Sequence, residues 1–132
     1  MVAWLAARND PPNYGSLVAF NFPKERQIDG TQQVEAFIDN DPVISEQFTL
    51  WGQSGSLVLR GNLLVIPVGD SILYAEPIYL QAEALDFPEL KRVILAAQGE
   101  DPVMLPTLED SLTALLGEPP ISGELAGIVG EE

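Results

Sequence analysis

The side chain best placed for acid–base chemistry is Glu76, because its neighbours along the sequence are apolar or aromatic on both sides. Burial among such neighbours raises the pKa of a carboxyl group unless a cation compensates. Arg60 is the only basic residue between Arg26 and Lys91, and it lies on the predicted strand that precedes the one carrying Glu76. A diagonal cross-strand contact would bring its guanidinium to the carboxylate. Because perturbed carboxylates also occur in structural networks, we interpret this pair as a structural ion pair rather than a catalytic one.

A second acidic group, Asp39-Asn40-Asp41, has the residue types of a calcium-binding loop. An EF-hand loop, however, needs ligands at alternating positions, a glycine at the sixth position and a glutamate at the twelfth. Asp41 followed by Pro42 is typical of a helix start, because aspartate caps the first turn and proline is tolerated at its first position. We therefore predict a helix cap here and no metal site.

Patterns for nucleophiles and ligands are weak in the rest of the chain. Residues 52–56 (GQSGS) approach the nucleophile-elbow motif, but they lack its final glycine, follow a predicted helix rather than a strand and have no base, so we expect a turn. Trp4, Trp51, Tyr74 and Tyr79 could line a pocket, although aromatic residues at such spacings more often form the core. No glycine-rich phosphate loop is present, so no nucleotide cofactor is expected.

Composition excludes further classes of chemistry. The 132 residues contain no histidine and no cysteine, which removes Ser-His-Asp and thiol nucleophiles, disulfides and the usual zinc sites. The net charge is −14 and the six basic residues are scattered, so we predict no nucleic-acid partner. These observations predict a protein that is not an enzyme and that holds neither cofactor nor metal.

Apolar periodicity and turn residues define the elements that position these side chains. We predict strands at residues 2–7, 17–22, 57–59, 63–68, 72–74 and 90–97, and helices that begin near Thr31, Pro42 and Thr107. This order favours an α+β fold with a mostly antiparallel sheet of about five strands and two to three helices packed on one face. The helix from Thr31 carries Val34, Phe37 and Ile38 on its apolar stripe.

Two features of the predicted sheet are specific enough to test. Residues 63–66 are apolar at every position, which predicts a central strand covered on both faces. Pro77 cannot donate a ladder hydrogen bond, so its strand should bulge, lie at an edge or break there.

The chain is interpreted as a single α+β domain over residues 1–117, followed by an acidic, flexible C-terminal tail over residues 118–132. The longest apolar run, residues 63–68, is far shorter than the roughly 20 residues of a transmembrane helix. The first predicted strand begins abruptly, as expected if the chain is part of a longer protein.

Several stretches, in their order and spacing, resemble Uncharacterised Protein Family 0182. They are residues 1–8 (MVAWLAAR), 13–15 (NYG), 50–51 (LW), 60–67 (RGNLLVIP), 74–81 (YAEPIYLQ), 89–94 (ELKRVI) and 107–109 (TLE). The resemblance implies a parent that is a large bacterial membrane protein with several transmembrane helices, in which this chain is a soluble part near the C-terminal end. It also implies a cell-membrane location with this domain on the extracytoplasmic side, and it assigns no residue a role.

Two functions follow as hypotheses. The first is a non-catalytic structural or interaction domain whose partner is the remainder of its own chain, with a homo-oligomer as a further possibility. This hypothesis predicts an exposed apolar surface or an open sheet edge. The alternative is a ligand- or cation-binding domain of a transport- or envelope-associated protein, with acidic side chains near Glu76 or at Asp39 and Asp41.

Overall fold

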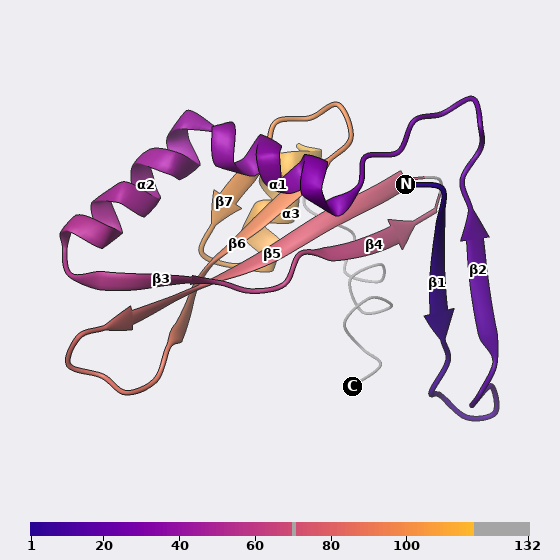
Figure 1. Ribbon diagram of the computed structural model, residues 1–132, viewed down its shortest axis with the longest axis horizontal. Coiled ribbons are helices and arrows are strands. Elements are labelled where there is room, and N and C mark those ends of the chain that lie inside the picture. The colour runs from indigo at the N-terminus through magenta and orange to yellow at the C-terminus, as the bar shows by residue number, and fades with distance from the viewer. Residues whose placement is uncertain (70, 118–132) are drawn as a thin grey trace. The chain divides into compact units, whose positions relative to one another are not determined.

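The structure is a computed structural model that describes residues 1–69 and 71–117 (Figure 1). It divides into two compact units, one formed by Met1–Gly30 and the other by the chain from Thr31 onward. The sequence predicts one domain over residues 1–117, and within that span the structure distinguishes these two units. The predicted tail at residues 118–132 lies outside the described residues.

The first unit is built on one antiparallel hairpin, β1 (Ala3–Ala7) and β2 (Leu17–Asn21). The connecting loop returns the chain through Gly15, whose positive φ of 84° is a conformation that favours glycine. Trp4 and Phe20 face each other across the hairpin and pack edge to face, with their ring centroids 5.4 Å apart. The hairpin is therefore held by its ladder and by one aromatic pair.

The second unit contains an antiparallel sheet of five strands, which confirms the predicted α+β class. Its elements are α1 (Thr31–Asn40), α2 (Pro42–Gln53), β3 (Ser56–Arg60), β4 (Leu64–Val68), β5 (Ser71–Ala82), β6 (Glu89–Ala97), β7 (Val103–Leu105) and α3 (Leu108–Leu116). The strand order is β3-β5-β6-β7, and β4 also pairs with β5. The long strand β5 is central: β3 and β4 follow one another along one side of it, and β6 pairs with the other side.

The prediction of a central strand at residues 63–66 is wrong. In the described structure β4 pairs with β5 alone, and Leu64 is 53% exposed. The apolar run reflects a strand that is half-buried against its neighbours. An apolar pattern reports burial, whereas the number of pairing partners depends on where the rest of the sheet lies.

Pro77 marks the place where β5 changes partner from β3 to β4, and the expectation of a break or bulge there is confirmed. Gly61 donates its backbone N–H to the Pro77 carbonyl at 2.8 Å, and proline has no N–H to return. On the other side of β5, the register with β6 shifts between Ile78 and Tyr79. A Cβ atom added to Gly61 would lie only 2.5 Å from Pro77 Cγ, so the two strands approach closely because residue 61 is glycine.

The predicted helix caps at Asp41 and Thr107 are confirmed. One carboxylate oxygen of Asp41 accepts hydrogen bonds from the N–H groups of Val43 and Ile44, each at 3.0 Å, at the start of α2. The hydroxyl of Thr107 accepts from Asp110 N–H at 3.0 Å at the start of α3. Both caps satisfy N–H groups that have no partner within the helix.

Helix α3 covers one face of the sheet. Its Leu112 packs in a core cluster with Ala75 of β5 and with Val93 and Leu95 of β6. Ser111 is fully buried beside this cluster and donates a hydrogen bond to the carbonyl oxygen of Val93 at 2.8 Å. This bond fixes the helix to β6, and Figure 1 shows the two elements together.

The other two helices contact the opposite face, so the prediction that all helices lie on one face is wrong. Glu76 and Ile94 are paired across β5 and β6, and their side chains alternate with those of the α3 cluster. Arg60, which binds Glu76, is also contacted from α1 and α2, as described below. On α1, Val34 and Ile38 are buried as predicted, but Phe37 is 58% exposed.

Candidate functional site

Arg60 and Glu76 form a buried, two-point ion pair between β3 and β5. Arg60 Nε donates to Glu76 Oε1 at 2.9 Å, and Arg60 Nη2 donates to Glu76 Oε2 at 3.0 Å. Glu76 is only 2% exposed, whereas the Arg60 side chain is 31% exposed. The predicted diagonal contact is confirmed, since Arg60 is registered opposite Ile78, two residues along β5 from Glu76.

The same guanidinium joins both helices of this face to the sheet. Arg60 Nη1 donates to Asp39 Oδ1 at the end of α1. The guanidinium carbon of Arg60 lies 5.6 Å from the centre of the Phe48 ring on α2. The hydrogen bonds that Arg60 donates to Glu76 raise the pKa of Arg60 above its usual range, and burial acts in the opposite direction. Arg60 therefore stays charged and connects four elements.

This geometry favours a structural role for the pair over a chemical one. Both oxygens of Glu76 already accept hydrogen bonds from Arg60, so a substrate would have to displace the guanidinium to reach the carboxylate. Arginine presents a rigid fork that matches a carboxylate in this way, and it does not lose its proton in proteins.

The structure separates the acidic residues that the sequence placed together at Asp39 and Asp41. Asp39 binds Arg60, while Asp41 caps α2. Over residues 1–69 and 71–117, no three or more acidic side chains gather in a way that could hold a metal ion.

Residues 52–56, which approach the nucleophile-elbow motif, form the end of α2 and the turn into β3. Ser54 donates its hydroxyl to the carbonyl of Leu50 at 3.0 Å, which ties the hydroxyl to the helix end. Gly55 follows with a positive φ of 84°. The expected turn is confirmed, and it precedes a strand rather than following one.

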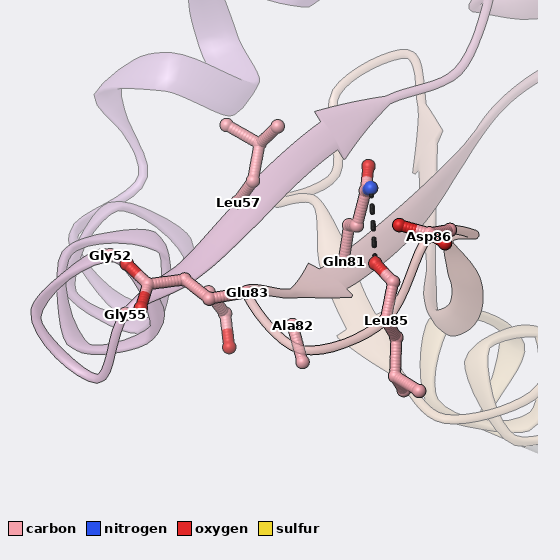
Figure 2. A pocket seen from close by; sticks show the side chains of 9 residues that line it. Gly52, Gly55, Leu57, Gln81, Ala82, Glu83, Leu85 and Asp86 are labelled. Atoms are coloured by element: carbon pink, nitrogen blue, oxygen red, sulfur yellow. Dashed lines mark hydrogen bonds between the residues drawn. The ribbon is translucent and has the colours of Figure 1, made fainter.

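A shallow hollow lies beside this turn (Figure 2). It has a volume of about 420 Å³, and it is lined by Gly52, Gly55, Ser56, Leu57, Gln81, Ala82, Glu83, Leu85 and Asp86. The carboxylate of Glu83 extends towards Gly55, and the Gln81 side chain donates to the Leu85 carbonyl at 3.2 Å. Sequence reasoning missed this hollow, because its walls come from two turns about thirty residues apart, each of which reads as an ordinary connection.

The aromatic residues proposed as a pocket do not line the hollow. Tyr74 is buried in the core at 1% exposure. Trp51 lies under Arg92, whose guanidinium carbon is 5.5 Å from the centre of the ring, a cation–π contact that joins α2 to β6. These side chains serve packing.

One face of the β1–β2 hairpin, which we call the hairpin face, exposes two leucines to solvent. It consists of Ala3, Leu5, Ala7, Leu17 and Ala19, which share a side in the pairing register with one polar residue, Asn21, at the end opposite Ala3. Leu5 is 74% exposed and Leu17 is 79% exposed. Neither strand contains a charged residue.

None of the helices in the described part of the chain has both the length and the apolar character needed to cross a lipid bilayer.

Comparison with known proteins adds a family. The family model described as "Uncharacterised protein family (UPF0182)" matches residues 1–51. UPF0182 proteins of Pelotomaculum thermopropionicum and Desulforamulus reducens are 54% and 56% identical to the chain over 118 residues, or 89% of its length. A relative from Bradyrhizobium diazoefficiens is 57% identical over 120 residues, or 90% of the chain. The chain spans only 13% of the length of each of these relatives. No solved structure matches.

Proposed function

Because the chain belongs to the uncharacterised family UPF0182 and spans only 13% of its relatives' length, we propose that it is a non-catalytic interaction domain that packs against the remainder of its parent chain. The observation that carries the proposal is the hairpin face. Exposed leucines on a strand pair without charges are typical of a surface that a partner covers.

The energetics of a hairpin support this proposal. A two-stranded hairpin is at best marginally stable in water, and a third strand or a packed face is needed for independent stability. Fully burying a leucine side chain contributes about 1.5–3 kcal/mol. Coverage of Leu5 and Leu17 would therefore stabilise the first unit substantially, and most of the parent chain lies outside these 132 residues.

The state of the acidic residues supports the absence of catalysis. The buried carboxylate of Glu76 is held by Arg60, and the carboxylates of Asp39 and Asp41 are bound to Arg60 and to the backbone of α2. The acidic side chains that were candidates for acid–base chemistry are thus bound within the fold.

We also propose, from the family resemblance, that the parent is a multi-pass protein of the cell membrane and that this domain lies on the extracytoplasmic side. A cysteine introduced at Glu100, an exposed turn residue, tests the side. A membrane-impermeant thiol reagent added to intact cells should label it as fast as in lysed cells. Labelling only after lysis would place the domain inside.

Docking can be tested with cysteines, because the chain has none of its own. Leu5→Cys and Leu17→Cys are made separately in the full-length parent and in the 132-residue chain, with Glu100→Cys as the exposed control. Labelling at each site is then followed by mass spectrometry of the peptide that contains it.

We expect the two leucine sites to label at least ~10-fold more slowly in the parent than in the short chain, because local protection reflects how often a covered surface opens. The Glu100 site should label at the same rate in both. Equal rates at the leucine sites would contradict docking through the hairpin face.

The alternative, a cation-binding domain, has the hollow beside Glu83 and Asp86 as its best location. Two lining carboxylates supply few of the roughly six to eight oxygen ligands that calcium takes. Calorimetric titration of the 132-residue chain with calcium, magnesium and manganese is therefore expected to give no heat and no change in Tm. A saturable rise in Tm that Glu83→Gln removes would favour the alternative.

A further inference from the structure

The ladder of the hairpin shows which backbone groups of β2 point away from β1. Arg8 N–H donates to Ser16 oxygen at 2.8 Å, and Phe22 N–H donates to Val2 oxygen at 3.1 Å. In an antiparallel pair, hydrogen-bonded and non-hydrogen-bonded pairs alternate along the ladder. Since the pairs 8–16 and 2–22 are hydrogen-bonded, the residues at odd positions form the non-hydrogen-bonded pairs. The N–H and C=O groups of Leu17, Ala19 and Asn21 therefore point to the outer edge of β2.

These outward groups form a row that is open to pairing. Within residues 1–69 and 71–117, the backbone groups of Leu17, Ala19 and Asn21 make no hydrogen bond beyond the hairpin. The strand contains no proline and no charge, which are two of the features that prevent pairing at a sheet edge. The outer edge of β2 can accept a further strand without any change in its own conformation.

The edge of β1 is a weaker candidate. Three of the five residues of β1 are alanine, whereas β2 offers the larger side chains of Leu17, Val18 and Phe20 to an added strand. Apart from Asn21, the side chains beside the β2 edge are apolar on both faces: Leu17 and Ala19 on the hairpin face, Val18 and Phe20 on the other. A strand added there would have to be apolar on at least the side next to Leu17.

We propose that an extended, uncharged and largely apolar segment of the parent chain, outside these 132 residues, adds as a strand to the outer edge of β2. This inference rests on the proposed function and specifies the contact as main-chain pairing. The length of the relatives supports a segment of the same chain, since 87% of each lies beyond the matched region. A second copy is disfavoured, because two chains of net charge −14 repel each other.

Amide hydrogen exchange in the full-length parent tests this pairing, because strand addition protects a distinctive set of amides. Val18 and Phe20 donate within the hairpin and should be slow both in the parent and in the 132-residue chain. Leu17, Ala19 and Asn21 should exchange fast in the short chain and at least ~100-fold more slowly in the parent, since an amide is released only when its hydrogen bond opens. Mass spectrometry with single-residue fragmentation can separate the exchange rates of alternate amides along β2.

A proline variant at the edge provides the matched comparison. Ala19→Pro removes an N–H that the hairpin itself does not use, and proline is tolerated at such edge positions. In the parent it should return Leu17 and Asn21 to fast exchange, whereas Ala19→Val, which keeps the N–H, should leave them slow. Slow exchange at Val18 and Phe20 shows in each variant that the hairpin is intact. Should Ala19→Pro unfold the hairpin, the pattern in the unmodified parent and in Ala19→Val still decides the question.

Three results would overturn the inference. Fast exchange at Ala19 together with slow thiol labelling at Leu5 and Leu17 would mean that the hairpin face is covered by packing alone, and the proposed function would survive. Slow exchange at Ala3, Leu5 and Ala7 instead would assign the added strand to β1. Protection that disappears on dilution of the parent would identify a second copy as the occupant.

Discussion

The hairpin of the first unit and the sheet of the second differ in how well their edge strands are protected against further pairing. Each strand of the hairpin has five residues, an apolar sequence and an outer edge without charge or proline. In the second unit, β7 has only three residues and is flanked by Pro102 and Pro106, and β4 contains Pro67. Short strands and prolines are the usual means by which a sheet edge avoids further pairing. Within the described residues, two of the three edge strands of the sheet are therefore protected by length or proline, and the third, β3, ends in the charged Arg60, whereas neither strand of the hairpin has such a residue.

The two units also differ in what fills their interior. The sheet buries Ile78, Ile94 and Leu95 almost completely and is covered by helices on both faces. The hairpin has one aromatic pair, and its leucines face solvent. We conclude that most of the stability of the 132-residue chain resides in the second unit.

The substitution with the largest expected effect on stability is Arg60→Met. The substitution leaves the carboxylate of Glu76 buried without its cation, which in comparable sites costs about 3 kcal/mol. Urea denaturation should show this loss in the free energy of unfolding. The double variant Arg60→Met/Glu76→Leu should recover most of it, because no charge is then left buried. A single variant as stable as the original would show that the ion pair does not hold the helices to the sheet.

Gly61→Ala should have the next largest effect. The added Cβ would lie 2.5 Å from Pro77 Cγ, so the two strands must separate at the point where β5 changes partner. Overpacking of this kind costs roughly 1–3 kcal/mol. Gly52→Ala serves as the control, since a Cβ at Gly52 meets nothing within 4 Å. Equal urea midpoints for the two variants would mean that the close approach is not required.

Leu5→Ser combined with Leu17→Ser should have a smaller effect in the 132-residue chain. These side chains are 74% and 79% exposed, so their loss should change the free energy of unfolding by no more than about 0.5 kcal/mol. In the parent, the same pair of substitutions should increase the proteolysis of the hairpin loop. A large destabilisation of the short chain would show that the hairpin contributes to its stability without a partner, which would end the contrast between the units.

The smallest expected effect is local to the hairpin loop. The hydrogen bond from Arg8 lowers the pKa of Asp10 from 3.8 to about 2. A lowered folded-state pKa gives stability that is present above pH 3.8 and is lost as the pH falls through about 2. Both side chains are exposed, so only the loop should respond. An NMR titration of the Asp10 carboxyl carbon should show a midpoint near 2, and Arg8→Gln should move it towards 3.8.

Local chemistry made part of the fold and of the candidate site predictable from sequence. Asp41 and Thr107 cap helices through contacts within three residues, so a short window contains all that is needed. The contact between Arg60 and Glu76 was predictable because a single cation lies in the middle of the chain, within the same run of predicted strands as Glu76.

Features that depend on distant segments were not predictable. Phe37 satisfies the helical spacing but lies off the line that joins Val34 and Ile38, and no neighbouring element covers it. The hollow beside Glu83 requires two turns to meet, which only the pairing of β3 with β5 brings about. The hydrogen bond from Arg60 to Asp39 could likewise be predicted only with the position of α1 over the sheet known.

The open edge of β2 also bears on how these 132 residues behave in solution when they are produced alone. Because β2 contains neither a charged residue nor proline, the remaining protection against pairing between hairpins of different molecules is the mutual repulsion of chains with a net charge of −14. Such repulsion extends about 8 Å at physiological ionic strength and about 3 Å at 1 M salt. The colloidal stability of the chain therefore depends on ionic strength, because its charge is what keeps that edge from pairing between molecules.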